Sequence, residues 1–231
     1  MTPLPTGPHG RFPHNLVAVV DTETTGLSIA TDRICSVGIV ALAYRDCRWR
    51  EVAAHEWLVD PCVAVGDRAS AVNGFDWNHY HPTPGKVNLA GLNPFPFAAY
   101  GILAAFGHAL VPTVCHNAPF DLGILDAELN RHDLGRRLWW PGYADTKAAF
   151  GELLGLPPTN AYRKETSLDA LCTRLGVSRA PRLAADGSER THSALADARL
   201  TAACFALLEP LGWMRLACPS ELPRRRLKTA A

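Results

Sequence analysis

Apolar residues in this chain fall into short runs that are separated by turns and by longer stretches with helical spacing. The first three runs, at 16–20, 34–44 and 49–59, are rich in β-branched residues and lie close enough in the chain to pair as an antiparallel meander. Two later runs, at 111–115 and 138–144, predict further strands. The pattern therefore predicts a sheet whose first strands are joined by turns and whose later strands are reached by longer connections.

Helical spacing of apolar residues follows the meander. It predicts five helices, over 97–110, 119–132, 146–154, 167–175 and 193–208. Pro119 suits the first turn of a helix, and Ser167 and Gly176 are typical residues for a helix start and a helix end. A meander followed by alternating helices and strands predicts an α/β fold, with a mixed five-stranded sheet (a three-strand antiparallel meander plus parallel strands) flanked by helices.

The length of 231 residues suits one compact domain, or one domain with an insertion. We assign residues 15–210 to this domain and 1–14, which holds four prolines, to a flexible leader. Residues 76–96 are rich in Pro, Gly, Asn and aromatic residues, and we interpret them as a loop insertion. Residues 211–231 form a C-terminal tail, whose basic end we expect to be disordered.

Composition narrows the class of protein. Apolar residues make up 48% of the chain, which is enough for a substantial core, and the net charge is only +1. A nucleic-acid binder that relied on bulk charge would be more basic, so binding would have to use a local groove and metal ions. The seven cysteines are odd in number and show no CxxC spacing, which favours reduced thiols in a cytoplasmic protein. The first 14 residues do not read as a signal peptide, and no apolar run approaches the roughly 20 residues of a membrane span.

Candidate chemistry lies in three acidic clusters. Asp21 and Glu23 are two residues apart at the end of a predicted strand, where both side chains point to one face. Two such carboxylates repel unless a cation lies between them, although a single pair of this kind is common by chance. Asp121 lies in the first turn of a predicted helix, where the helix dipole alone would favour it. Asp197 lies among small apolar residues five positions after His192, and burying it is costly without a partner or a metal.

These clusters become specific when their order is considered. The segments VVDTETTGL (19–27), HNAPFD (116–121) and HSALADA (192–198) together resemble the three exonuclease motifs of the DEDDh family, which includes the proofreading subunit of bacterial DNA polymerase III. The resemblance covers about 17–208 and implies a ribonuclease-H-like fold. A sister group has a tyrosine four residues before the last Asp; Ser193 stands there in this chain and excludes that group.

The resemblance also implies roles for matching residues. Two divalent ions, Mg²⁺ or Mn²⁺, would be held by Asp21, Glu23, Asp121 and Asp197, with Asp21 bridging them. His192 would act as the general base for the attacking water. Such a pair of ions stabilises the attacking and leaving oxygens in phosphodiester hydrolysis, and an imidazole near the water can take its proton.

The same comparison implies a pocket for the 3′-terminal nucleotide. The residues expected to contact this nucleotide or to lie beside the bond that is cleaved are Thr24, Thr25, Gly26, Leu27, Asn73, Phe75, Asn117 and Phe120. The family has His-Gly-Ile where this chain has Asn73-Gly74-Phe75, so contacts with the terminal base are expected to differ. Aromatic residues of the insertion, Trp77 and Tyr80 among them, could stack on bases, but packing of the loop onto the domain is the more ordinary interpretation.

The leading hypothesis is a metal-dependent 3′→5′ exonuclease that hydrolyses phosphodiester bonds at the 3′ end of DNA, in proofreading or end trimming, and releases 5′-nucleotides. The substrate would be single-stranded or 3′-frayed DNA, and a DNA polymerase is a candidate partner. The first alternative is an exoribonuclease of the same family. The second is a non-catalytic, polymerase-associated module that binds nucleic acid, which would be expected if one of the four carboxylates or the histidine were missing.

Overall fold

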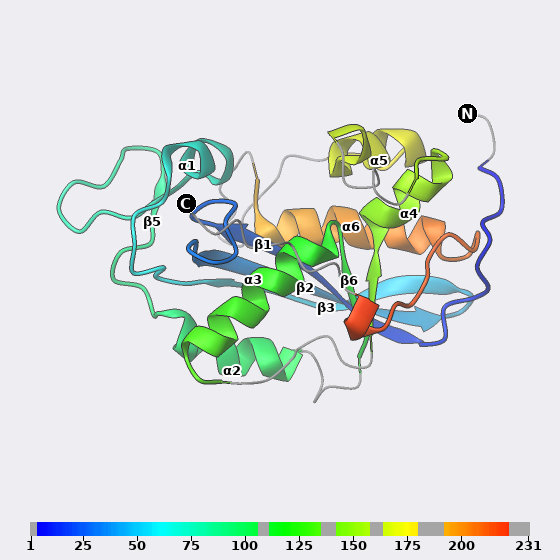
Figure 1. The fold of residues 1–231 in the computed structure, drawn as a ribbon, viewed down its shortest axis with the longest axis horizontal. Coiled ribbons are helices and arrows are strands. Elements are labelled where there is room, and N and C mark those ends of the chain that lie inside the picture. The colour runs from blue at the N-terminus through cyan, green and yellow to red at the C-terminus, as the bar shows by residue number, and fades with distance from the viewer. Residues whose placement is uncertain (1–3, 106–110, 135–141, 158–163, 180–191, 222–231) are drawn as a thin grey trace.

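A five-stranded sheet forms the centre of the molecule in the computed structural model, which describes residues 4–105, 111–134, 142–157, 164–179 and 192–221 (Figure 1). The strand order is β3-β2-β1-β6-β7, with β1 next to β2 and β6. Pairing is antiparallel from β3 to β1 and parallel from β1 to β7. The predicted mixed sheet is therefore confirmed, with strands at Leu16–Thr24 (β1), Ile34–Arg45 (β2), Arg48–Leu58 (β3), Thr113–Cys115 (β6) and Tyr143–Asp145 (β7).

Helices cover both faces of this sheet, as Figure 1 shows. Val17 and Val19 of β1 pack with α4, α5 and α6, whereas Ala18 and Val20 pack with α2 and α3. This alternation follows from the two-residue period of a strand and places an apolar core on each side of β1. The helices are Asp67–Asn73 (α1), Phe95–Ala105 (α2), Ala118–Arg131 (α3), Thr146–Leu153 (α4), Leu168–Leu175 (α5) and Ala194–Leu208 (α6).

The ends of the elements mostly follow the predicted local signals. The Ser167 hydroxyl accepts a hydrogen bond from the backbone N–H of Ala170, and Gly176 ends α5 in the left-handed conformation, as expected. Ser193 caps α6 in the same manner. The first strand continues four residues beyond 20, so Asp21 and Glu23 lie within β1 and not after it. Most of the predicted strand 138–144 and the basic tail lie outside the described residues.

The insertion is more ordered than a plain loop. Two short strands, Phe75–Asp76 (β4) and Val87–Asn88 (β5), pair in parallel, and the preceding helix α1 was not predicted. Asp60, two residues after β3, accepts hydrogen bonds from the backbone N–H of Gly91 (2.9 Å) and from the Trp77 indole (2.6 Å). These bonds attach both arms of the insertion to the edge of the main sheet.

The stretch that was expected to be a flexible leader contacts the domain over its described part, residues 4–14. Phe12 is buried, and its backbone N–H donates to the Glu209 carboxylate (2.8 Å). The backbone N–H of His9 donates to the carbonyl of Gly212 (2.9 Å). The prolines do not prevent this, because Phe12 supplies an apolar anchor at the end of α6, where it packs against Phe205.

All seven cysteines are free thiols, as expected. Four of them, Cys35, Cys115, Cys172 and Cys204, are buried, whereas the other three are exposed. No helix within the described ranges combines the length and the apolar character that crossing a membrane requires.

Candidate active site

The candidate site lies at the C-terminal end of strand β1. Asp21 and Glu23 point to the face that α6 covers, because they share the alternation of Val17 and Val19. Thr22, between them, belongs to the opposite face, toward α3. The two predicted acidic residues of the first motif therefore face the helix that carries Asp197.

Helix α6 can approach β1 and β2 closely because residue 38 is glycine. Gly38 on β2 pairs with Asp21 on β1, and a Cβ atom on Gly38 would lie 2.3 Å from the carbonyl carbon of Ala194. No side chain fits into that space, so the first turn of α6 rests directly on the sheet. This contact sets the position of His192 and Asp197 relative to Glu23.

Glu23, His192 and Asp197 come together in space. One potential ligand atom from each lies within 4.8 Å of the others. The Nδ1 atom of His192 is 2.7 Å from Oδ2 of Asp197. Because a carboxylate accepts, Nδ1 carries the hydrogen, and Nε2 of a neutral imidazole keeps its lone pair. His192 is partly exposed, whereas Asp197 is buried, so the imidazole lies at the boundary between the cluster and solvent.

Asp121 reaches the same strand from the other layer. Its Oδ1 atom accepts hydrogen bonds from the backbone N–H (3.1 Å) and the hydroxyl (2.8 Å) of Thr22. Asp121 thus lies beside the peptide that links Asp21 to Glu23. The structure brings the carboxylates of all three motifs to one end of β1, although only Glu23 and Asp197 belong to the tight group with His192.

The start of α3, and with it Asp121, is held by Asp145 at the end of β7. The Asp145 carboxylate accepts from the backbone N–H groups of Asn117 (3.1 Å) and Ala118 (3.0 Å), and it also caps α4. Asn117 adopts the left-handed conformation, with φ of 95°. Sequence reasoning missed this role of Asp145; its position before a helical stretch signals a helix cap, but not the bonds to a segment 28 residues earlier.

Burial and neighbouring negative charges disfavour the ionised forms of the carboxylates at the site. Burial raises the pKa of Glu23 well above its usual range, and the nearby Asp197 carboxylate adds to this, while His192 opposes it. Burial also raises the pKa of Asp121, and Asp145 contributes in the same direction, while the hydrogen bonds from Thr22 oppose it. Glu56 on β3, which sequence reasoning also missed, adds a further negative charge near Glu23. A cation would relieve this repulsion.

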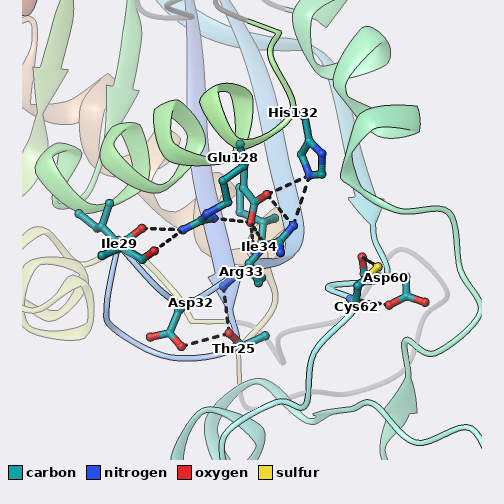
Figure 2. A network of polar contacts seen from close by, with 11 residues as sticks. Thr25, Ile29, Asp32, Arg33, Ile34, Asp60, Cys62, Glu128 and His132 are labelled. Atoms are coloured by element: carbon teal, nitrogen blue, oxygen red, sulfur yellow. Dashed lines mark hydrogen bonds and ion pairs between the residues drawn. The ribbon is translucent and has the colours of Figure 1, made fainter.

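The loop after β1 is anchored to α3 by a partly buried ion-pair cluster (Figure 2). Glu128 is almost fully buried and accepts from Arg33 Nε (2.8 Å) and Arg131 Nη1 (2.8 Å). Arg131 Nη2 donates in turn to the backbone carbonyls of Ile29 (2.8 Å) and Ala30 (3.0 Å). The Thr25–Ile29 segment is thereby fixed to the helix that carries the acid of the second motif.

Residues expected to contact a nucleotide lie in different environments. Leu27 is 80% exposed, whereas Thr24, Thr25 and Phe120 are buried, and Asn117 and Gly26 are partly exposed. A Cβ on Gly26 would lie 2.5 Å from the Asp32 carboxylate, so the glycine allows the loop to close on Asp32.

The remaining two residues that were expected to contact the nucleotide are both buried. Asn73 is buried; its side-chain amide donates to the carbonyl of Thr24 (3.1 Å), and its oxygen accepts from the backbone N–H of Phe75 (3.0 Å). Phe75 has no exposed surface and packs with Cys35 and Leu89. In this conformation Phe75 therefore presents no surface to a nucleotide, and Asn73 supports the backbone of Thr24.

No family model matches the chain, but individual proteins do. Ribonuclease T of Escherichia coli (strain K12) is 30% identical over 207 residues, which cover 87% of this chain and 87% of that protein. Ribonuclease T of Shigella flexneri matches to the same extent. The chain belongs to the DEDDh family of 3′–5′ exonucleases. As a DEDDh exonuclease, it is a hydrolase that acts on the 3′ ends of nucleic acid.

Solved structures confirm the fold of this DEDDh exonuclease. The nuclease domain of 3′hExo, described as a DEDDh family member bound to rAMP, superposes with a TM-score of 0.66 at 12% identity and covers 90% of this chain and 98% of that chain. Cell-death related nuclease 4 gives 0.64 at 14% identity, covering 89% and 67%. Exonuclease I of E. coli, in complex with a dT13 oligonucleotide, gives 0.61 at 18% identity, covering 85% and 41%.

Proposed function

We propose that this protein is a metal-dependent exonuclease that removes nucleotides one at a time from the 3′ end of single-stranded RNA. The observation that carries the proposal is the cluster of Glu23, His192 and Asp197 at the end of β1, with Asp121 held beside it by Thr22. The products would be nucleoside 5′-monophosphates, because water attacks phosphorus and the bond to the 3′ oxygen breaks.

The residues of the cluster fit a pair of divalent ions. Carboxylate oxygens are the ligands that Mg²⁺ and Mn²⁺ prefer, and a bound cation would offset the burial and the neighbouring Asp197 charge that raise the pKa of Glu23. Asp21, Glu23, Asp121 and Asp197 would hold the ions. When bound, two such ions would supply the positive charge that stabilises the attacking and leaving oxygens.

His192 would accept the proton of the attacking water. Its Nδ1 atom is occupied by Asp197 at 2.7 Å, which orients the ring and leaves Nε2 to act as the base. Asp197 would thus serve both the metal and the histidine. The partial exposure of His192 gives water access to the ring.

The end of β1 and the loop that follows it would receive the terminal nucleotide. Thr24, Thr25 and Gly26 would approach the sugar with their backbone, and exposed Leu27 would contact the base. Asn117 and Phe120 would border the nucleotide from α3. Asn73 would act indirectly, by holding the carbonyl of Thr24.

RNA is placed first because the relative at 30% identity is a ribonuclease by name. DNA, which the sequence motifs alone placed first, is the alternative substrate; Exonuclease I, which has the same fold, is described with a DNA oligonucleotide. The 2′-hydroxyl distinguishes the two substrates, and it is read by details of the pocket that the motifs do not fix.

The test uses RNA and DNA of matched sequence, labelled at the 5′ end, with Mg²⁺ or Mn²⁺. We expect a ladder that shortens from the 3′ end, faster for RNA, and absent with chelator and in Asp197→Ala. Faster cleavage of DNA would show that DNA, and not RNA, is the preferred substrate. No cleavage of either strand, with binding retained, would favour the non-catalytic module.

Metal binding has a readout that does not depend on cleavage. A ligand that binds only the folded state raises stability, by about 2.7 kcal/mol at one hundred times its Kd. Mn²⁺ should therefore raise the Tm of the wild type, and Glu23→Gln should abolish most of the shift. An equal shift in both proteins would place the metal elsewhere.

A further inference from the structure

The tip of the insertion, residues 77–81, carries a row of rings that runs outward from the domain. Trp77 is partly buried and donates its indole N–H to Asp60. His79 contacts Trp77 with ring centroids 5.0 Å apart, and Tyr80 follows at 6.4 Å from His79. Exposure increases along the row, and Tyr80 is 86% exposed. The first ring belongs to the fold, whereas the last one is presented to solvent.

The backbone beneath these rings is held by side chains. Asn78 accepts from the backbone N–H groups of Tyr80 (3.0 Å) and His81 (2.9 Å) through its side-chain oxygen. Asn88 bonds Asn78 from the opposite arm, at 3.0 and 2.8 Å. A tyrosine on such a loop loses little further conformational freedom when a flat ligand stacks on it.

Helix α1, which precedes the insertion, connects it by hydrogen bonds to the loop that would receive the terminal nucleotide. Helix α1 bonds to that loop at both ends: Gly66 N–H donates to the carbonyl of Thr25 (3.0 Å), and the Asn73 amide donates to the carbonyl of Thr24 (3.1 Å). Strand β4 follows α1 directly, and Figure 1 shows the insertion projecting at the end of the molecule where α1 lies. The segment that leads into the tip is thus hydrogen-bonded to the end of β1 and to the loop of the candidate site.

Charge on the insertion suits a polyanion. The insertion, 76–96, contains a single acidic residue, Asp76, although the whole chain has 22 acidic residues. It also includes Lys86 and two exposed histidines, His79 and His81. The carboxylate of Asp76 accepts hydrogen bonds from the backbone N–H groups of Trp77 (2.8 Å) and Thr83 (2.7 Å), whereas residues 77–81 themselves carry no negative charge.

We propose that the insertion tip, with Tyr80 at its centre, is a stacking surface for the upstream part of the same single strand whose 3′ end occupies the candidate site. The inference rests on the proposed function. Aromatic rings bind bases of any sequence through their faces, so the tip would add affinity without adding sequence preference. Short substrates would not reach it, and the contribution of Tyr80 would depend on substrate length.

The experiment compares kcat/KM on a dinucleotide and on a dodecanucleotide for the full-length wild type and three variants. Tyr80→Ala should lower kcat/KM on the dodecanucleotide by about 5-fold or more and leave the dinucleotide unchanged. Tyr80→Phe should retain wild-type values because it keeps the ring. The matched control is Tyr100→Ala: Tyr100 is 73% exposed, but lies on α2, on the far side of the sheet from α6, and should change neither rate.

Equal values for Tyr80→Ala and the wild type on both substrates would overturn the inference, and so would an equal loss on both. Binding of the dodecanucleotide, measured by fluorescence anisotropy in EDTA, decides the same question without cleavage. A wild type that cleaves neither substrate would refute the proposed function, whereas a loss of binding confined to Tyr80→Ala would still support the stacking surface.

Discussion

Gly38 and Ala194 are in direct backbone contact, with no room for a side chain between strand β2 and the start of α6. A Cβ on Gly38 would also lie 2.3 Å from the backbone nitrogen of Leu195. Since Gly38 pairs with Asp21 in the sheet, this contact joins the strand of the first motif to the helix of the third. The spacing between Glu23 and Asp197 depends on it.

Gly38→Ala should therefore displace the first turn of α6. Overpacking of this kind costs about 1–3 kcal/mol of stability, and the shift should separate Asp197 from Glu23 and reduce cleavage. Chemical denaturation and a cleavage assay measure the two effects. Gly10→Ala is the matched control, because a Cβ on Gly10 meets nothing within 4 Å. Full activity of Gly38→Ala would show that the contact does not set the site.

The bonds from Arg131 to the loop after β1 predict an effect on substrate affinity. Arg131→Met removes the donors to the carbonyls of Ile29 and Ala30, which should loosen the Thr25–Ile29 segment. Loss of about 1.4 kcal/mol of binding energy would raise KM about tenfold, with kcat little changed, because the carboxylates remain in place.

Arg199→Met is the control for this experiment. Arg199 forms an ion pair with Glu51, but both side chains are exposed, and such pairs contribute little. We expect its KM to match the wild type. A fall in kcat for Arg131→Met at unchanged KM would contradict the assigned role, because it would place the effect on the chemical step.

The proton-accepting role of His192 predicts a loss in kcat. His192→Gln keeps a polar side chain but removes the base, and general base catalysis contributes about 10²- to 10⁴-fold. RNA binding in chelator should be unchanged. His55→Gln is the comparison, since His55 is exposed on β3, outside the cluster. Near-normal kcat in His192→Gln would assign the proton to another acceptor.

His116, in the second motif, predicts an acid-sensitive fold. Burial lowers its pKa to about 3, and the charge of Lys147 adds to this shift, so the folded protein keeps the ring neutral. Between Thr146 and the carbonyl of Thr166, the ring bridges α4 and the segment before α5. The unfolded chain takes up a proton near pH 6.5.

Stability from this residue is therefore complete above pH 6.5 and is lost as the pH falls toward 3. The loss amounts to roughly 2 kcal/mol at pH 5, from 1.36 kcal/mol per pH unit. Urea denaturation at pH 8 and pH 5 should show a smaller difference for His116→Gln than for the wild type. Parallel pH dependence of the two proteins would mean that His116 is not the responsible group.

Local patterns accounted for much of the fold. Neighbouring residues determine the apolar runs of β1, β2 and β3 and the caps of α5. These features could therefore be predicted from the sequence. Helix α1 was missed because its seven residues carry only a weak apolar pattern and its N-cap, Gly66, has no capping side chain. The two-residue strands β4 and β5 are too short to show a period.

The contacts of the site between residues far apart in the chain could not be predicted from local sequence patterns. The motifs indicated Glu23, His192 and Asp197, which the fold brings together. The residues around Arg33 and Glu128 do not indicate that these two side chains pair across 95 positions. The sequence also does not indicate that Leu27 is exposed whereas Phe75 is buried, because both are apolar. These contacts depend on how layers pack, which the apolar pattern defines only in outline.

The most direct test of the central claim is the identity of the first product released from RNA that carries a label in its 3′-terminal nucleotide. The account predicts that wild-type protein with Mg²⁺ or Mn²⁺ releases a labelled nucleoside 5′-monophosphate before any longer fragment, and that Glu23→Gln releases none. Labelled oligonucleotides as first products, or a nucleoside 3′-monophosphate, would contradict it.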